Sequence, residues 1–459
     1  MKHNGTRYSA VSLFSGGMGL DIGLYDTGRF SLLACVEMVP SFCDTIRVNR
    51  DAGRIDPNMR MYQNDIRRLD ARKIMKDLGL KRGEVDLVVG GPPCQSFSTA
   101  GRRGTVQDPR GTLLWDFLRF VEAMQPKMFL MENVRGLMSA ALKHRPISER
   151  PEKGGAPLER EEEPGSVIRL FLRDLHDQYR LDCFEVNAVN YGAPQLRERV
   201  LFIGNRFNRV VEFPRPTHSQ PVSEHKEWFV SGAQGMKPFR TLGDALKGLN
   251  DSDRVLMDFS PRKKRYLELV PPGGNWRSLP GDIAKESMGE AYCAKGGRSG
   301  WWRRLSLELP CPTVVTMPNH ASTALCHPSE VRALSLRECA RVQEFPDEWE
   351  FRGTAAEQYA QVGNAVPIRL GSICGEVLGG ELRKIYESRM DILPGNNPSC
   401  RVVYLRSHVR TRHWFKDGAP VVWEDGEENN ISRYGRARTN VAVSTIGKEK
   451  SYGSKECKR

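Results

Sequence analysis

A chain of 459 residues is long enough to bury a large core, and we expect two unequal domains because single cores stop growing at about 250 to 300 residues. Lys and Arg total 69 against 56 Asp and Glu, and the net charge of +13 favours a polyanionic partner such as nucleic acid, although a protein that is merely basic has the same composition. The 11 cysteines form no CxxC pair and no apolar stretch approaches the roughly 20 residues of a membrane span, which excludes a disulfide framework, a zinc ribbon and a membrane helix. We therefore expect a soluble, cytoplasmic monomer with reduced thiols and no metal site.

Short apolar runs alternate with helix-like segments from Val11 to Gly204, which is the pattern of consecutive βαβ units. The predicted strands are Val11–Phe14, Leu32–Glu37, Met61–Ile66, Val85–Gly90, Met128–Met131, Phe184–Val189 and Val200–Ile203. Helices are predicted at Leu113–Val121, which is followed by Pro126, and at Ile368–Tyr386. The fold class indicated is α/β, with a Rossmann-like, mostly parallel sheet and helices on both faces.

Changes in composition divide the chain into regions. Residues 143–165 are crowded with Pro, Gly, Glu and Arg and lack an apolar period, which predicts a mobile surface insertion. Residues 205–333 are basic, irregular and rich in Pro, Gly and Trp, and predict a second, smaller domain. Apolar periodicity returns in residues 334–392, which we expect to complete the domain formed by residues 1–204, and residues 393–459 read as a basic C-terminal tail.

A glycine-rich segment, Leu13–Asp21, follows the first strand and opens a helix, so a ligand could approach the backbone and the helix amino end there. Alone, such a segment is often only a tight turn. Glu37 ends the second strand roughly 20 residues later, where an acid bonds a ribose hydroxyl in nucleotide sites, and Asp65 ends the third strand in the same way. Together these strand ends predict a pocket for an adenosine-like cofactor.

The tetrapeptide Pro92-Pro93-Cys94-Gln95 follows the buried strand Val85–Gly90 and places a thiol at its carboxyl end. An inert buried cysteine is the alternative, but the two prolines stiffen the turn and favour a displayed side chain. Glu132 ends the next strand, where it is a helix cap, a solvated acid or the partner of the thiol. A thiol and a carboxyl in one cleft suit covalent catalysis with proton donation.

Two further segments precede or follow predicted elements. Gln195–Arg199 alternates two arginines onto one face of a strand, where they either contact a phosphate or a base oxygen or are solvated on an edge strand. Gly363–Pro367 is a turn with an Asn before the last helix, and a simple cap explains it equally well.

Taken in order, these segments resemble the DNA (cytosine-5) methyltransferase family, of the bacterial restriction-modification type. The blocks that carry the resemblance are Phe14–Gly19, Gly91–Ser98, Glu132–Val134, Gln195–Arg199, Arg337–Gln343 and Gln361–Pro367. Met18 departs from the pattern, because the family usually has glycine at that position. The resemblance covers most of the chain from Val11 to Tyr386 and implies a class I S-adenosylmethionine-dependent methyltransferase with a target-recognition domain in residues 205–333.

The resemblance also implies a reaction and its residues. Cys94 would add to C6 of a cytosine flipped out of double-stranded DNA, Glu132 would bond N3 and the exocyclic amine, Arg199 would contact O2, and Arg197 would support the neighbouring loop or a phosphate. S-adenosyl-L-methionine would be bound by Phe14, Ser15, Gly16, Gly17, Gly19, Leu20, Glu37, Met38, Asp65, Ile66, Pro93, Leu113, Asn364 and Ala365. DNA would be bound by Gln95, Ser96, Ser98, Arg102, Arg103, Gln195, Arg277, Arg298, Arg303 and Arg304.

Two other functions fit parts of this pattern. A relative that methylates RNA shares the catalytic core, but that branch typically follows the cysteine with Pro-Phe-Thr, whereas Ser96-Phe97-Ser98 occurs here. A catalytically silent DNA-binding regulator would not need Cys94, Glu132 and Arg199. Genetic pairing with a restriction endonuclease is expected, although a solitary modification enzyme would have the same sequence features.

Overall fold

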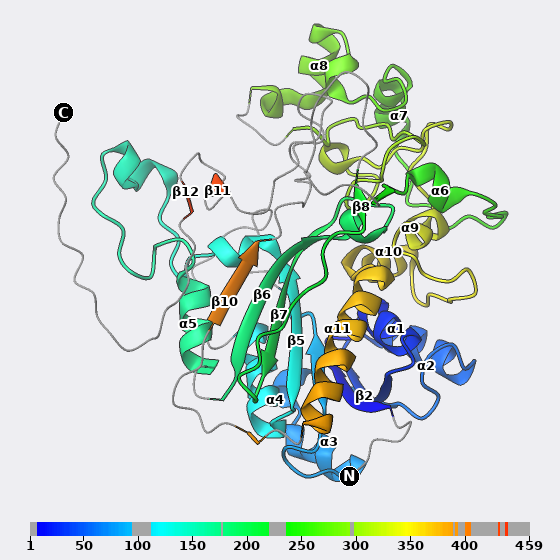
Figure 1. Cartoon of the computed structure of the whole chain (residues 1–459). Coiled ribbons are helices and arrows are strands. Elements are labelled where there is room, and N and C mark those ends of the chain that lie inside the picture. Colours follow the sequence, from blue (N-terminus) through cyan, green and yellow to red (C-terminus); the bar gives the residue numbers. More distant parts are fainter. Residues whose placement is uncertain are drawn as a thin grey trace.

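The structure is a computed structural model that describes residues 7–93, 112–175, 178–219, 236–293, 298–388, 391–392, 400–404, 430–431 and 437–438. Its centre is an eight-stranded sheet with the order β10-β6-β7-β5-β4-β1-β2-β3 (Figure 1). The strands are β1 (Tyr8–Leu13), β2 (Phe30–Glu37), β3 (Arg60–Gln63), β4 (Leu87–Gly90), β5 (Met128–Val134), β6 (Arg180–Asn187), β7 (Glu198–Asn205) and β10 (Cys400–Tyr404). Only β7 runs antiparallel to its neighbours in this sheet, so the predicted mostly parallel sheet is confirmed.

Two predicted strands end earlier than expected because a polar side chain caps the turn that follows. β3 stops at Gln63, and the Asp65 carboxylate accepts the backbone N–H of Arg67 at the start of a 3-10 turn. β6 stops at Asn187, whose side chain accepts the backbone N–H of Val189 in the same manner. Such side-chain bonds to the backbone compete with the strand ladder. Asp65 therefore lies in the turn beyond the sheet rather than at the end of a strand.

Alternation of side chains along the strands builds a buried layer on each face of the sheet. Ala10, Leu87 and Val89 face one cluster, whereas Val11 and Val88 face the other. The first cluster is closed by α1 (Gly19–Asp26) and α11 (Ile368–Glu387), and the second by α3 (Ala71–Leu78), α4 (Leu113–Met124) and α5 (Ser166–Leu175). The alternation explains why these strands read as continuous apolar runs, since both faces are covered.

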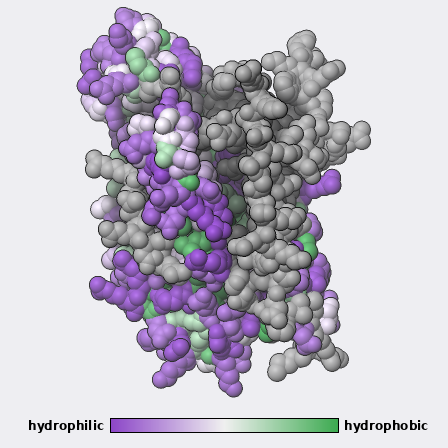
Figure 2. All heavy atoms as spheres, turned by 90° about the vertical axis from the view of Figure 1, so that its left-hand side faces the viewer, coloured by the Kyte–Doolittle hydropathy of each residue, from purple (hydrophilic) through white to green (hydrophobic). Residues whose placement is uncertain are grey.

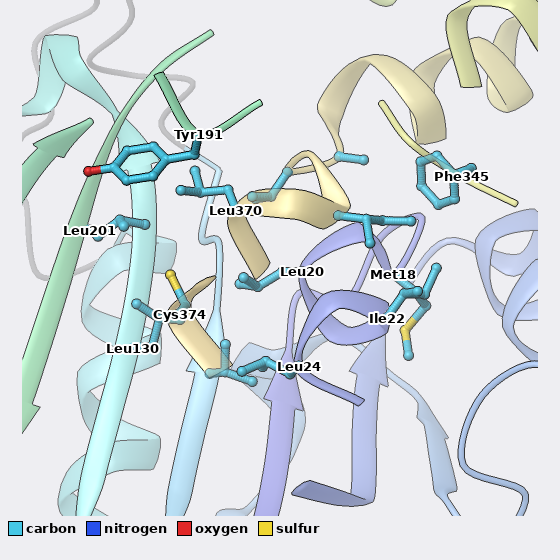
Figure 3. Packing of buried hydrophobic residues seen from close by; sticks show 14 of the residues in the cluster. Met18, Leu20, Ile22, Leu24, Leu130, Tyr191, Leu201, Phe345, Leu370 and Cys374 are labelled. Atoms are coloured by element: carbon cyan, nitrogen blue, oxygen red, sulfur yellow. The ribbon is translucent and has the colours of Figure 1, made fainter. Parts of the chain in front are cut away.

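The late helix α11 packs directly on α1, although more than 300 residues separate them in the sequence. Figure 3 shows Leu20 and Leu24 of α1 beside Leu370 and Cys374 of α11, with Leu130 of β5 next to Cys374. The helices are so close that a Cβ on Gly23 would lie 2.3 Å from the carbonyl oxygen of Ile368. The end of the chain thus contributes a buried layer next to the glycine-rich segment that follows β1.

Residues 205–333 contain short elements and a buried cluster of their own. The elements are β8 (His218–Ser219), β9 (Lys237–Pro238), α6 (Leu242–Leu246), α7 (Pro261–Glu268) and α8 (Gly281–Met288). Tyr266, Leu267 and Trp302 pack together in the cluster beneath α7 and α8, in the upper part of Figure 1. This region leads into α9 (Leu336–Val342) and α10 (Ala355–Asn364), which precede α11.

Residues 143–165 form a looped segment whose ends are joined by ion pairs. Lys143 pairs with Glu161, and Arg145 with Glu162, with Nε of Arg145 2.9 Å from Oε1 of Glu162. Only short 3-10 turns, Ile147–Glu149 and Pro151–Lys153, occur between them.

The face of the molecule that is on the left in Figure 1 is shown in Figure 2. Its described atoms are largely hydrophilic, with small hydrophobic areas.

The described part of the C-terminal region contains strands, including a short antiparallel pair of β11 (Asn430–Ile431) and β12 (Ala437–Arg438). Cys400–Tyr404 forms β10, which pairs in parallel with β6 at the edge of the main sheet. Sequence inspection did not predict this strand, because Cys400–Tyr404 is short and stands within a strongly charged stretch. No helix among the described residues is long and apolar enough to cross a membrane.

Candidate active site

The turn after β1 lies against the end of β2, and the Glu37 carboxylate joins the two. Its Oε2 accepts the backbone N–H of Gly16 at 2.9 Å, and its Oε1 accepts those of Met38 and Val39 at 2.8 and 2.9 Å. The backbone N–H of Ser15 is also bonded to the carbonyl oxygen of Val36. These bonds hold a buried carboxylate at the carboxyl edge of the sheet, where open α/β folds bind nucleotides.

Met18 is the residue that departs from the family pattern in the glycine-rich segment, and its conformation shows how the segment accommodates it. Its φ of 68° lies in the left-handed region that glycine adopts easily, and its side chain is buried beside Ile22 and Phe345 (Figure 3). The strain of a non-glycine residue there, about 1 kcal/mol, is offset by the burial of the thioether side chain. The backbone therefore keeps the path that a glycine would take.

Gly19 has no room for a side chain. A Cβ on Gly19 would lie 2.2 Å from the carbonyl oxygen of Val366 and 3.2 Å from Cβ of Ala365. The glycine-rich segment is thus in direct contact with the turn at the end of α10, where Asn364 is the last helical residue and Ala365 follows it. Asn364 is exposed and Ala365 is buried at this contact.

The other predicted cofactor residues lie around the same edge. Met38 exposes 53% of its surface next to Glu37, which is unusual for an apolar side chain. Phe14 and Leu113, at the start of α4, are half-buried and pack on the same buried cluster as Ile66. Asp65 follows β3, and the guanidinium of Arg67 at 2.6 Å lowers the pKa of its carboxyl. Apolar side chains flanking two carboxylates suit an adenosine, which has an apolar ring face and two ribose hydroxyls.

Asp21 lies in α1, at the end of the glycine-rich segment, and the pKa of its carboxyl is raised. It is buried in α1, where burial raises the pKa of its carboxyl to about 7 despite a hydrogen bond from the Ser12 hydroxyl. Oδ1 has no hydrogen-bond partner, and the Ser12 hydroxyl lies 2.9 Å from that of Ser15 in the glycine-rich segment. The acid thus supports the glycine-rich segment from inside the protein through two hydroxyl groups.

Replacing Asp21 by asparagine should raise stability at alkaline pH. The folded pKa of about 7 exceeds that of an unfolded carboxyl near 4, so the unfolded chain ionises first and stability falls as the pH rises between these values. The loss amounts to about 4 kcal/mol at most, and an amide does not incur it. Chemical denaturation at about pH 5 and about pH 8 checks this, because the advantage of Asp21→Asn should grow with pH. If wild type and Asp21→Asn differed in free energy of unfolding by the same amount at both pH values, Asp21 would be ionised in the folded protein at both.

A second group of residues lies at the end of β5 and the start of β7, and β4 separates β5 from β1. Antiparallel pairing sets Val134 opposite Arg199, and Nε of Arg199 contacts Oε1 of Glu132 at 2.5 Å. Both side chains keep 11% of their surface exposed, so the pair is shielded but reachable. Oε2 of Glu132 would lie 3.0 Å from a Cβ on Gly91, which places the carboxylate against the segment that follows β4.

Asn133 fixes that segment and was not predicted as a site residue. Its buried amide donates to the carbonyl oxygen of Pro92 at 3.0 Å and accepts the backbone N–H of Val134 at 2.9 Å. Pro92 is buried and Pro93 is exposed. Cys94, which follows directly, lies outside the described residues, as do Gln95, Ser96, Ser98, Arg102 and Arg103. The sequence signal that could have identified Asn133 as a site residue is its position within the block Glu132–Val134.

The donors of four predicted contact residues bond to other parts of the chain. Gln195 and Arg197 are buried, with 0% and 1% exposure, and bond to other parts of the chain. Arg303 donates to the carbonyl oxygen of Ala324, and Arg304 to those of Val270 and Pro328. Complete burial disagrees with the DNA-binding assignment of Gln195, whereas that of Arg303 and Arg304, which are half-buried, stays a prediction.

Arg277 and Arg298 both lie over the ring of Trp276, at 4.9 and 4.8 Å from its centroid. Arg298 also donates to the carbonyl oxygen of Tyr292. Arg277 is exposed, and stacking on an indole restricts its side chain without consuming its donors. Of the arginines predicted in residues 205–333, Arg277 is the one whose placement suits contact with DNA.

The strand order and the location of the site define the class I methyltransferase fold. A crystal structure described as that of a prophage-encoded DNA modification methyltransferase of Escherichia coli has the same fold, with a TM-score of 0.52, 24% identity, and coverage of 83% of this chain and 99% of that one. A family model for C-5 cytosine-specific DNA methylase matches residues 8–150 and 163–379.

The chain belongs to the C-5 cytosine-specific DNA methylase family and is a DNA cytosine-5-methyltransferase. The type II methyltransferase M.Sau96I of Staphylococcus aureus is 36% identical over 377 residues, which are 81% of this chain and 75% of the relative. M.PspPI of Psychrobacter sp. is 37% identical, with 81% and 79% covered, and M.Eco47II of Escherichia coli is 34% identical, with 82% and 80% covered. The family match omits residues 151–162, which lie within the predicted insertion.

Proposed function

We propose that this methyltransferase transfers a methyl group from S-adenosyl-L-methionine to C5 of a cytosine flipped out of double-stranded DNA, through a covalent adduct with Cys94. The observation that carries the proposal is the Glu132–Arg199 pair, held against Gly91 three residues before Cys94. Because the relatives M.Sau96I and M.PspPI are type II methyltransferases, we also propose that the product protects host DNA from a cognate restriction endonuclease.

The residues around Glu37 fit the proposed cofactor. The Glu37 carboxylate would accept the ribose hydroxyls, Phe14 and Met38 would flank the adenine, and the Gly16 backbone leaves the approach open. Asp65, Ile66 and Leu113 would line the adenine side, and Asn364 and Ala365 the opposite end. The bound cofactor supplies an electrophilic methyl group on sulfur.

Glu132 and Arg199 would activate the cytosine. C5 is a poor nucleophile, so the Cys94 thiolate would add to C6 and move electron density to C5 and N3. Glu132 would bond N3 and the exocyclic amine as charge develops, and Arg199 would contact O2, inside a site that excludes most water. After C5 accepts the methyl group, loss of the C5 proton and of the thiolate restores the aromatic ring and frees Cys94.

Base recognition would come from residues 205–333, the proposed target-recognition domain, with residues 1–204 and 334–392 as the catalytic domain. The target base must leave the stack to reach Glu132, at a cost of a few kcal/mol. Arg277 is positioned by Trp276 for a contact with a phosphate or with a base edge in the major groove. The net charge of +13 supports binding to phosphates in general.

A tritium-transfer assay with labelled S-adenosylmethionine tests the proposal. Label should enter double-stranded DNA and be recovered as 5-methylcytosine, while RNA of the same sequence should stay unlabelled. Transfer to RNA alone would identify an RNA methyltransferase, and DNA binding without transfer would identify a silent regulator. Bisulfite sequencing of the product would then give the recognition sequence.

A further inference from the structure

Three segments that are far apart in the sequence meet beside the active site. They are Gln195–Arg197 before β7, Cys311–Val314 in the last part of residues 205–333, and Val362–Ala365 at the end of α10. Gln195 pairs with Cys311 in a short parallel bridge, and the Thr313 hydroxyl donates to the carbonyl oxygen of Leu196. Their backbones therefore form one packed junction.

The side chains of Gln195, Arg197 and Gln343 fill this junction, and we call them the polar bracket. Gln343 lies at the end of α9 and donates to the carbonyl oxygens of Val362 at 2.6 Å and Ala365 at 3.0 Å. Gln195 donates to Oε1 of Gln343 at 2.6 Å and accepts the backbone N–H of Val314 at 3.3 Å. Each amide is 0% exposed, so each bond is made without competition from water.

Arg197 completes the polar bracket. Its Nη1 donates to the carbonyl oxygen of Val314 at 3.0 Å and its Nη2 to that of Gly363 at 2.9 Å. Burying a guanidinium is costly, so a position that only needed packing would suit an apolar residue better. The fork geometry of arginine instead fixes two carbonyl oxygens at a set separation.

The junction is tightly packed where it contacts the end of α10. A Cβ on Gly363 would lie 2.6 Å from the backbone nitrogen of Thr316, so the chain that follows Cys311–Val314 lies directly against the end of α10. On its other side, the turn at the end of α10 contacts Gly19 of the glycine-rich segment. A shift of the turn would therefore reach the cofactor edge of the sheet.

We propose that the polar bracket consists of positioning residues that set the turn at 363–365 relative to β7, and hence the cofactor edge relative to the Glu132–Arg199 pair. Gln195 and Arg197 then serve the reaction without touching DNA or cofactor. The inference rests on the proposed function, since it assumes that Asn364 and Ala365 adjoin the cofactor. Methyl transfer requires the methyl group and C5 to align, and an error of about 1 Å lowers such rates about a hundredfold.

Replacing Gln343 by methionine tests the proposal, because the side chain keeps its size but loses both donors to the turn. Cofactor affinity, measured by calorimetry without DNA, should fall roughly tenfold, as two lost hydrogen bonds predict. The matched control is Asn49→Leu. Asn49 is also 0% exposed and donates to the carbonyl oxygens of Thr45 and Glu350, but it lies in α2 (Pro40–Asp51), away from the junction.

At a similar loss of thermal stability, Asn49→Leu should bind the cofactor within about twofold of wild type. Equal weakening in both variants, or none in Gln343→Met, would overturn the proposal. If Gln343→Met does not fold, Gln343→Asn replaces it, since its shorter amide does not span both carbonyls. Wild-type protein is assayed in parallel: if it fails to bind the cofactor or to methylate DNA, the proposed function fails, whereas an active wild type isolates the test of the bracket.

Discussion

Replacing Glu132 by glutamine should lower the rate of methyl transfer about a thousandfold, with little change in cofactor affinity. The amide has the same size, but it does not carry the negative charge that faces Arg199, and it cannot exchange a proton with N3 of the base as a carboxyl group can. Nε of Arg199 lies 2.5 Å from Oε1 of Glu132, so the change also leaves a shielded guanidinium without its counter-ion. Single-turnover transfer of labelled methyl groups, at saturating cofactor, measures the effect on the chemical step.

Loss of a buried ion pair by itself destabilises a protein, and Glu381→Gln controls for this. Glu381 in α11 contacts Nε of Arg209 at 2.7 Å and is buried to a similar degree, but it lies outside the candidate site. Both substitutions should lower the unfolding midpoint, and only Glu132→Gln should remove transfer. Near-normal transfer by Glu132→Gln, or an equal loss in Glu381→Gln, would remove the proposed role of Glu132.

Cys94→Ala should abolish transfer while cofactor binding stays within about twofold of wild type. Without the thiol no adduct forms at C6, and C5 remains a poor nucleophile. Pro92, two residues earlier, is held by the Asn133 amide, so the chain enters this position from a fixed point beside Glu132. DNA that contains 5-fluorocytosine should trap wild-type protein as a stable complex, and Cys94→Ala should form none.

The other cysteines provide the control. Cys293 is exposed, and burial raises the pKa of Cys311 to about 12, which keeps that thiol protonated at neutral pH. Cys293→Ala should therefore methylate and trap DNA like wild type. Persistent turnover of Cys94→Ala would show that another residue is the nucleophile.

The positions of Glu37 and Glu132 were predictable from sequence, because each ends an apolar run that forms a strand. In a parallel sheet the carboxyl ends of such runs share one edge, and the register follows from the alternation of the two faces. Glu132 and Glu37 lie at that edge in β5 and β2. The strand boundaries at Asp65 and Val189 were less accurate, because single side-chain caps decide them.

The fates of the arginines were decided only by the tertiary structure. Gln195, Arg197 and Arg199 follow one another in a single motif, yet Arg199 reaches Glu132 whereas Arg197 turns inward to the carbonyl oxygen of Gly363. A long cationic side chain suits solvent, DNA or a buried carbonyl equally well in the sequence, and the choice depends on partners that are distant in the sequence, such as Glu132 for Arg199 and Val314 for Arg197.

The sequence by itself determined the α/β architecture, the family and the strand ends that bear the site, because local periodicity and strand order carry that information. The tertiary structure decided which polar groups face the site and which support it. Asp21 illustrates the reason, since burial raises the pKa of its carboxyl to about 7 while its neighbours in the sequence look unremarkably apolar. Such properties arise only when distant segments pack together. They include burial, the antiparallel pairing of β7, and the carbonyl oxygens that accept hydrogen bonds from Arg197 and Gln343.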